Sequence, residues 1–313
     1  MFFTNHLTSF HSQALLERKG EPCALIITKG FKNLLDIGNQ SRPKIFDLAI
    51  TVPDVLYTTV VEANERVSLM GDDASKQLSD KEGTCEKGIT GEWVKILEPL
   101  DIPQIRRDLQ TVFDHGIRSV AISLMHSYTF PRHEKLIAEV AKDVGFANIT
   151  LSSEIMPMVK IVSRAASAMA DAYLTPCIQR YIEGFFEGFD ANIRDMQKVR
   201  VEFMQSDGGL TPVDDFSGFR AILSGPAGGV VGFAKTSLSE SPVIGFDMGG
   251  TSTDVSRFAG SYEQVLETTT AGVIIQAPQL DINTVAAGGG SRLFFRNGLF
   301  VVGYVLSDVA TMC

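Results

Sequence analysis

Apolar and polar residues alternate along the first half of the chain in a way that predicts strands and helices in turn. Three short apolar runs, at Cys23–Thr28, Ser119–Met125 and Ile149–Leu151, are typical of buried strands. Ile102–Phe113 and Pro131–Val144 carry apolar residues at helical spacing, and a glycine soon follows each of them as a stop signal. This alternation predicts a layered α/β domain.

A long helix is predicted at residues 161–189, where many positions are alanine. Small side chains indicate that a helix or sheet approaches closely. Pro176 predicts an interruption, because proline lacks the N–H that an inner helical turn requires. The polar stretch Asp190–Lys198 is predicted to be a domain boundary, and the charged segment Asp73–Gly91 is predicted to be an exposed loop or insertion.

In the second half, apolar runs lead into glycine turns. Val199–Met204 is predicted to be a strand, and residues 224–234 a glycine-rich segment that continues as a helix. Residues 243–257 are predicted to form a strand, a turn and a returning strand. Asn297-Gly298, between two apolar runs, is the strongest short hairpin signal in the chain.

The predicted hairpin at 243–257 carries the most informative chemistry. Asp247 ends its first apolar run, and the residues that follow include Gly249, Gly250, Thr251, Ser252 and Thr253. Glycine lets backbone N–H groups approach an anion, and hydroxyls donate further hydrogen bonds. Asp247 is placed to hold Mg²⁺ through water. A turn that simply needs glycine is the alternative, but the carboxylate and the hydroxyls favour a phosphate site.

Four glycine clusters occur within about ninety residues, which predicts a phosphate cleft in an α/β protein. They are Gly208-Gly209, Gly228-Gly229, Gly249-Gly250 and Gly288-Gly289-Gly290. The chain contains neither the G-x-x-x-x-G-K-[ST] pattern of a P-loop nor a G-x-G-x-x-G that follows a strand. P-loop and Rossmann sites are therefore unsupported.

Asp207 and Asp247 each end an apolar run just before glycine, which predicts a pair of carboxylates for Mg²⁺ and an attacking water. Aspartates that only stabilise turns are the alternative. Strand alternation points Asp254 away from the side of its neighbours, so a supporting role is predicted for it. His126, after a predicted strand, is interpreted as structural rather than catalytic. Arg164 and Lys160, at the start of a predicted helix, either meet an anionic substrate or are solvated or salt-bridged.

Composition narrows the class of protein. The chain has 313 residues, of which 44% are hydrophobic, and a net charge of −9. That charge argues against binding to nucleic acid or a membrane surface, which requires basic patches. The four cysteines are scattered, and neither a signal peptide nor an apolar run of membrane-spanning length is recognised. The expected location is the cytosol.

Several long motifs, in order, resemble the hydantoinase A/5-oxoprolinase family. They include Leu-Met-His-Ser-Tyr-Thr (124–129), Ala-Asp-Ala-Tyr-Leu-Thr-Pro (170–176), Leu-Ser-Gly-Pro-Ala-Gly-Gly-Val (223–230) and Gly-Phe-Asp-Met-Gly-Gly-Thr-Ser-Thr-Asp-Val-Ser (245–256). Residues 276–291 look especially like the ATP-hydrolysing 5-oxoprolinases. The resemblance runs from about Ala14 to Gly303.

This resemblance implies an actin-like (ribonuclease H-like) ATPase architecture with two α/β subdomains. It implies a hydrolase that uses ATP and Mg²⁺ to open 5-oxo-L-proline to L-glutamate in the glutathione cycle, and a homodimer in the full-length family. Residues 14–190 would be a partial N-terminal-type domain and 191–303 a partial ATPase subdomain with the phosphate hairpin. Asp247 and Asp207 would be catalytic, and the glycines and hydroxyls of the turns would bind the nucleotide.

Residues 1–13 and 304–313 depart from the family pattern. Family members carry an earlier phosphate hairpin before the position of Ala14, and continue beyond that of Gly303. The chain is therefore expected to resemble a central fragment, with little or no ATP-dependent hydrolysis by itself. The alternatives are a non-catalytic module that interacts with the full-length enzyme, and a hydantoinase-type hydrolase of another cyclic amide.

Overall fold

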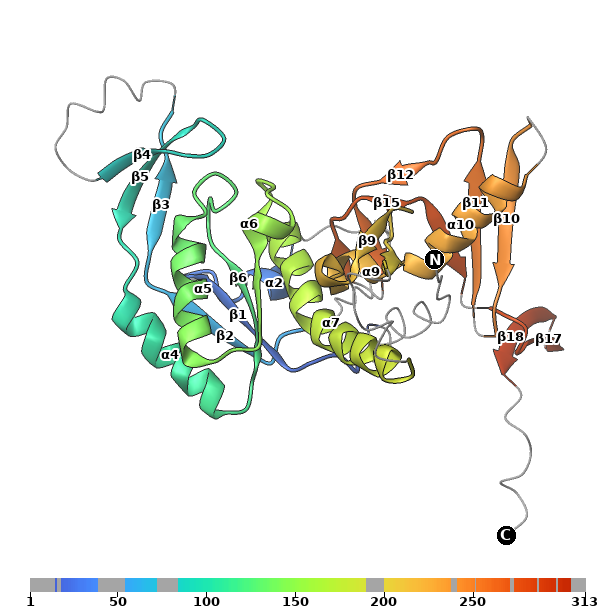
Figure 1. Ribbon diagram of the computed structural model, residues 1–313, viewed down its shortest axis with the longest axis horizontal. Helices are drawn as coiled ribbons and strands as arrows, with labels where there is room; N and C mark the ends of the chain where they lie inside the picture. Colours follow the sequence, from blue (N-terminus) through green and yellow to red (C-terminus); the bar gives the residue numbers. More distant parts are fainter. Residues whose placement is uncertain are drawn as a thin grey trace, which may run out of the picture.

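The structure is a computed structural model that describes most of the chain (Figure 1). The described residues are 15, 18–38, 54–71, 84–189, 200–237, 241–250, 252–270, 273–285, 287–296 and 298–304. Among them, the first half contains a parallel sheet with its helices, and the second half contains several small antiparallel sheets. This combination confirms the α/β prediction.

Four parallel strands form the central sheet of the first half. In spatial order they are β2 (Thr59–Ala63), β1 (Cys23–Thr28), β6 (Ser119–Ser123) and β7 (Asn148–Leu151). The three strands predicted from apolar runs are thereby confirmed. All six residues of β1 are buried, which explains why its sequence is apolar throughout instead of alternating.

Helices cover both faces of the parallel sheet. They are α2 (Leu34–Ile37), α4 (Ile102–Asp114), α5 (Arg132–Val144), α6 (Ser152–Ile155) and α7 (Ile161–Glu187). On one face, Ile105 of α4 and Ile137 of α5 share a core with Ile122 of β6. On the other face, Ala168 of α7 shares a core with Leu25 of β1. In Figure 1, α4 and α5 lie to the left of the sheet and α7 lies to its right.

The predicted interruption at Pro176 is wrong, since α7 continues through this residue. A proline at this position leaves the carbonyl of Ala172, four residues earlier, without its usual helical donor. The hydroxyl of Ser119 in β6 donates to that carbonyl at 2.6 Å. A side chain from the neighbouring sheet therefore satisfies the group that proline leaves unpaired.

A three-stranded antiparallel sheet extends from the first half, in the order β3 (Arg66–Leu69), β5 (Trp93–Glu98) and β4 (Thr84–Lys87). Of the loop or insertion predicted over Asp73–Gly91, the loop alternative is wrong where β4 forms, and residues 72–83 lie outside the described residues. A strand at the edge of an antiparallel sheet tolerates polar residues, because one of its faces meets water. The polar composition therefore concealed β4.

The second half is built around one helix and one three-stranded sheet. The helix is α10 (Ser224–Thr236), and the sheet has the order β10 (Val243–Met248), β11 (Thr253–Phe258) and β16 (Ile282–Val285). The ring of Phe233 in α10 lies so close to Gly245 that a Cβ there would come within 2.0 Å of it. Glycine at this position therefore allows α10 to pack on the hairpin.

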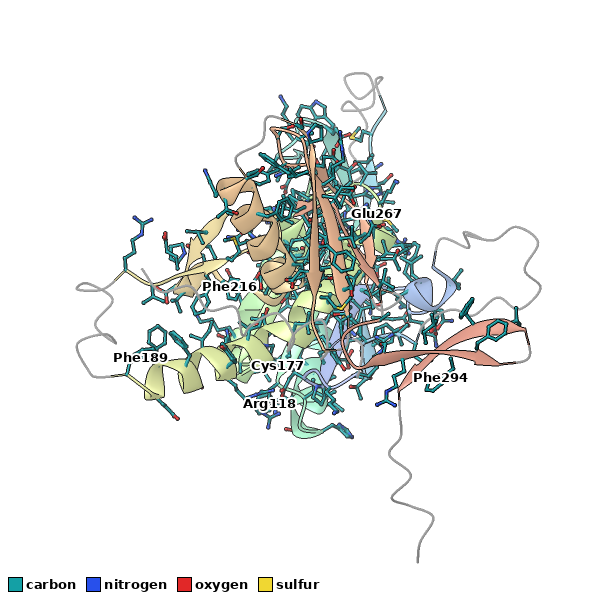
Figure 2. The ribbon with its side chains drawn as sticks, turned by 90° about the vertical axis from the view of Figure 1, so that its right-hand side faces the viewer. Arg118, Cys177, Phe189, Phe216, Glu267 and Phe294 are labelled. Carbon is teal, nitrogen blue, oxygen red and sulfur yellow. The ribbon has the colours of Figure 1, made fainter. Side chains whose placement is uncertain are left out.

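Shorter elements complete the second half. They are β8 (Glu202–Met204), β9 (Leu210–Pro212), the 3-10 helix η1 (Val213–Asp215), α9 (Gly218–Ala221), and the antiparallel pairs β12 (Gln264–Val265) with β15 (Gln279–Leu280), β13 (Thr268–Thr270) with β14 (Val273–Ile275), and β17 (Ser291–Arg296) with β18 (Leu299–Tyr304). The last pair is the predicted hairpin, and Figure 2 shows it, with Phe294, extending away from the rest of the molecule.

The two halves meet along α7. Val273 and Ile275 of β14 belong to the same core as the alanines of α7, and the N–H of Gln276 donates to Ser167 Oγ at 2.9 Å. The small side chains of α7 permit this approach, as predicted. The predicted domain boundary at Asp190–Lys198 lies outside the described residues. Of the helices that the structure describes, none combines the length and apolar character needed to cross a membrane.

Candidate phosphate site

The strands β10 and β11 form the hairpin that the sequence predicts. The register pairs Met248 with Thr253, so the connecting turn contains residues 249–252. Within this turn, the N–H of Gly249 donates to the carbonyl of Ser252 at 2.9 Å. Thr251, one of the predicted phosphate ligands, lies outside the described residues. The turn is exposed at Gly249 and Gly250, where an anion can approach the backbone.

Asp247 and Asp254 are direct cross-strand partners, so their carboxylates lie on the same face of the hairpin. Asp247 is exposed, whereas Asp254 is half-buried and accepts a hydrogen bond from Thr284 Oγ1 at 2.6 Å. Burial raises the pKa of the Asp254 carboxyl, and the charge of Asp247 adds to this rise, while the hydrogen bond from Thr284 opposes it. Two adjacent carboxylates attract a cation, because the cation interacts favourably with both negative charges and offsets the repulsion between them.

A glycine-rich segment supports the turn from behind. The N–H groups of Gly289 and Gly290 donate to the carbonyls of Gly249 and Gly250 at 2.9 and 3.0 Å. In a planar trans peptide the C=O and the following N–H point in opposite directions. The N–H of Gly250 is therefore turned away from this supporting segment, toward the side from which a ligand would come.

Thr253 contributes to the same support. Its hydroxyl donates to the carbonyl of Ala287 at 2.6 Å, and the residue is buried. This hydroxyl therefore positions the residues just before the triple glycine, and the predicted contact of Thr253 with phosphate remains a prediction. Ser252 is half-buried beside it. Two of the four predicted glycine clusters, Gly249-Gly250 and Gly288–Gly290, are in direct contact.

A third glycine cluster faces Asp247 from α10. A Cβ at Gly229 would lie 3.5 Å from Asp247 Oδ2, so Gly228-Gly229 passes close to the carboxylate. These glycines lie in the second turn of α10, beyond the first turn, where a helix end favours negative charge. A group near Asp247 would thus meet a helix surface without side chains and the exposed amides of the turn.

Asp207 and the fourth glycine cluster, Gly208-Gly209, form a separate turn that contacts α10. Asp207 Oδ1 accepts the N–H of Gly209 at 2.8 Å, the bond expected of an aspartate that stabilises its own turn. The turn is joined to α10, because Ser206 Oγ accepts the N–H of Leu223 at 2.9 Å and Gly208 lies against Val231. The structure therefore places Asp207 beside α10, and its role in catalysis remains a prediction.

Thr284 contributes to this site although no sequence motif marks it. It lies opposite Asp254 on β16 and holds that carboxylate. The register places Asp254 directly opposite Asp247, and its supporting role remains a prediction. A turn of four residues at 249–252 pairs position 247 with 254. Recognition of the turn length would have placed both aspartates on one face.

His126 and Arg164 lie far from this hairpin in the sequence and at the edge of the parallel sheet in the structure. Arg164 is 1% exposed and donates to Ser152 Oγ and to the carbonyls of Met158 and Leu124. It meets neither a salt-bridge partner at hydrogen-bonding distance nor open solvent in the part of the chain that the structure describes, so the salt-bridged alternative is replaced by a carbonyl-binding role. Lys160 remains exposed at the start of α7.

Family models cover most of the chain. Residues 4–145 match the model described as the hydantoinase/oxoprolinase N-terminal region, and residues 164–310 match the hydantoinase/oxoprolinase model. The chain is 52% identical to the 5-oxoprolinase of Dictyostelium discoideum, 54% to 5-oxoprolinase 1 of Arabidopsis thaliana and 48% to the 5-oxoprolinase of Saccharomyces cerevisiae. Each match includes 95% of this chain and 23–24% of the relative. The chain thus spans about a quarter of these relatives.

Two solved structures share the fold. The nucleotide-free structure of acetone carboxylase superposes with a TM-score of 0.67 at 20% identity, over 95% of this chain and 41% of that chain. The ATP-dependent caprolactamase from Pseudomonas jessenii superposes with a TM-score of 0.68 at 24% identity, over the same two shares. Both likenesses agree with the predicted architecture.

Proposed function

Because this chain belongs to the hydantoinase/oxoprolinase family, we propose that it supplies the phosphate-binding hairpin of an ATP-dependent hydrolase of cyclic amides, with 5-oxo-L-proline as substrate. The names of the relatives support the substrate. The observation that carries the proposal is the pairing of Asp247 with Asp254 beside a glycine turn that Gly289 and Gly290 support.

The proposed reaction requires a phosphate-binding site, because the cyclic amide must be phosphorylated before water can open it. A lactam resists water, so its carbonyl oxygen first attacks the γ-phosphorus of ATP and ADP leaves. Water then adds to the activated carbon, the C–N bond breaks, and the amine takes up the protons, which gives γ-glutamyl phosphate. A second water releases phosphate and L-glutamate. Phosphoryl transfer depends mostly on positioning and on stabilisation of charge, which backbone amides and a metal ion supply.

The residues present fit Mg²⁺. Asp247 is exposed and Asp254 stands beside it, while the described residues contain no cluster of three acidic, histidine or cysteine side chains. Mg²⁺ commonly binds through one or two carboxylates, phosphate oxygens and retained waters, so two carboxylates suffice. When bound, the ion would neutralise charge on the phosphates. Asp247 would hold it, and Asp254, fixed by Thr284, would orient the hydrated ion.

The chain's own backbone would hold the phosphate. The N–H of Gly250 faces away from the supporting glycines, and the absence of side chains at Gly249 and Gly229 leaves room beside Asp247. Thr253 keeps the supporting segment in place through Ala287. These residues position an anion and stabilise its charge, and none of them needs to form a covalent bond.

The cytosol is the proposed compartment. Cys23 and Cys177 are buried thiols, and burial raises the pKa of Cys23 to about 12. Buried thiols of this kind are typical of proteins in reducing compartments.

A transplant tests the function. The matching quarter of the D. discoideum 5-oxoprolinase is replaced by this chain, and glutamate and phosphate release are measured. We expect ring-opening activity in the chimera, and Asp247→Asn should lower kcat by about a hundredfold or more, the usual cost of removing a main charge-stabilising group. Asp281→Asn, an exposed aspartate just before β16, is the matched control and should leave kcat unchanged. An Asp247→Asn chimera as active as the control would overturn the proposal.

A second candidate function, a non-catalytic interaction module, is favoured by one observation. The face of β10 opposite Asp247 exposes Ile244, Phe246 and Met248, and a hollow of about 320 Å³ lies beside it against β17. Exposed apolar patches of this kind often bind another protein surface. Co-purification with a full-length homologue that Phe246→Ser abolishes, together with an inactive chimera, would favour this candidate over the first.

A further inference from the structure

The parallel sheet contains a topological switch point that lies apart from the β10–β11 hairpin. From β1 the chain passes to β2 on one side, and later to β6 on the other side of β1. The helices that follow β1 and β6, α2 and α5, lie on opposite faces of the sheet. In open parallel sheets, ligands bind outside the carboxyl ends of the strands at such a point. Here those ends are Thr28 and Ser123.

Hydrogen bonds join the two strand ends. The N–H of Met125 donates to Thr28 Oγ1 at 2.9 Å, and that hydroxyl donates to Glu65. The other oxygen of Glu65 contacts His133 Nδ1 at 2.8 Å. All three side chains are buried. The backbone that leads into His126 is therefore held on one side by β1 and α5.

The other side is held by α7 and α5. Arg164 donates to the carbonyl of Leu124 at 2.5 Å, and Glu134 accepts the N–H of the same residue at 2.9 Å. His126 follows with φ of 60°, one of two non-glycine residues with positive φ among those that the structure describes. Such backbone persists where the surroundings hold it, and it often marks a functional position. The imidazole is half-exposed, so this rigid frame presents it to solvent.

The electrostatic surroundings of His126 keep its imidazole uncharged. Burial, followed by the charge of Arg164, lowers the pKa of His126, so the imidazole is neutral near pH 7. The fields of two cations, Arg164 and Arg66, oppose those of two carboxylates, Glu65 and Glu92. A neutral imidazole has one N–H donor and one acceptor nitrogen on opposite sides of the ring, so it can either donate to the C=O of an amide or accept from its N–H.

Two buried hydroxyls at this edge lack partners. Ser123 Oγ ends β6 and Ser153 Oγ lies in α6, and neither makes a hydrogen bond within the described chain. These residues are 0% and 8% exposed. In Figure 1, α6 and the start of α7 lie together at the upper edge of the sheet. Buried polar atoms without partners are rare, and each indicates a group that the protein alone does not supply.

We propose that a small cyclic amide binds at the carboxyl ends of β1 and β6, with its amide group on the imidazole of His126. The buried ring of Tyr128, whose centroid lies 6.4 Å from that of His126, packs edge-on against the imidazole and helps to fix its position. The assignment rests on the proposed function, in which a cyclic amide is the substrate. It assigns that substrate contacts with residues other than those of the phosphate hairpin.

Nuclear magnetic resonance of the whole 313-residue chain, with its histidine rings isotopically labelled, tests this site. 5-Oxo-L-proline and 2-pyrrolidinone, which lacks a carboxylate, are titrated without nucleotide, and inorganic phosphate is titrated separately. We expect saturable movement of the His126 ring signals with both lactams, while the signals of His115, at the exposed end of α4, stay in place. Absence of movement, or movement with phosphate alone, would overturn the proposal.

Matched variants make the test quantitative. His126→Asn keeps a residue that tolerates positive φ but removes the imidazole, and its Kd for 5-oxo-L-proline should rise at least tenfold by calorimetry. His126→Gly, which tolerates the same backbone, should weaken binding equally, and His115→Asn should bind as the unsubstituted chain does. Unchanged affinity in both His126 variants contradicts the site.

The result of this binding test does not depend on whether the phosphate site functions. Asp247→Asn should bind the lactams as tightly as the unsubstituted chain, since no nucleotide takes part. If the lactams bind through His126 while the Asp247→Asn chimera stays fully active, the proposed function fails and the binding site stands. The reverse pair of results removes the binding site alone.

Discussion

The two main sheets of this chain differ in how they are covered. The parallel sheet around β1 has helices on both faces, and its central strand is fully buried. The β10–β11–β16 sheet has α10 on one face, while Phe246, on the other, is 65% exposed. Both faces of the parallel sheet are thus packed against helices, and this packing holds the residues at the ends of its strands in place. In the antiparallel sheet, the chemistry depends on local hydrogen bonds around a turn.

The largest effect is expected in the parallel sheet. Ile26 of β1 is fully buried in the core that α4 and α5 cover. Ile26→Ala removes packed atoms and leaves a cavity, so the free energy of unfolding should fall by about 3 kcal/mol. Urea denaturation, followed by fluorescence of the single tryptophan, Trp93, measures this change. A loss below about 1 kcal/mol would show that this sheet is not the stable core.

A smaller effect is expected where the sheet supports α7. Ser119→Ala leaves the carbonyl of Ala172 without a donor at the position that Pro176 has already weakened. The loss should be about 2 kcal/mol, because the hydroxyl also accepts from Asn148 Nδ2 at 2.9 Å and the substitution removes two buried hydrogen bonds. The double variant Ser119→Ala with Pro176→Ala should recover part of it, because alanine restores the helical N–H. Equal stability of the single and double variants would contradict this explanation.

The smallest effect is expected on the uncovered face of the antiparallel sheet. Phe246→Ser changes an exposed side chain, so the free energy of unfolding should stay within about 0.5 kcal/mol, as for most surface substitutions. Circular dichroism during heating and urea denaturation measures it. A loss near that of Ile26→Ala would mean that this face is buried in solution, and the contrast between the sheets would disappear.

These two regions also differ in how far the sequence predicts them. Apolar runs and helical spacing locate β1, β6, β7, α4 and α5, because both faces of that sheet are buried. The continuity of α7 through Pro176 depends on Ser119, 53 residues before Ala172, and no local pattern reveals that contact. The edge strand β4 was concealed by its polar composition.

At the site, the turn chemistry around Asp247 is evident from the glycines and the preceding carboxylate, and the structure confirms the hairpin. The contact of Gly289 with Gly249 joins residues forty positions apart, so sequence spacing alone could not show it. For Asp207, the local hydrogen bond to Gly209 agrees with the turn-stabilising alternative. The sequence thus indicates which residue types gather, while register and long-range contacts decide their partners.

The central claim is that the turn after Asp247 binds phosphate. Titration of the isotopically labelled chain with Mg-ATP, observed through backbone amide resonances, tests it most directly. We predict that the amide signals of Gly249 and Gly250 move most, together with those of Gly289, and that Asp247→Asn removes these movements. Movements confined to other residues, or unchanged movements in the Asp247→Asn variant, would contradict the phosphate site.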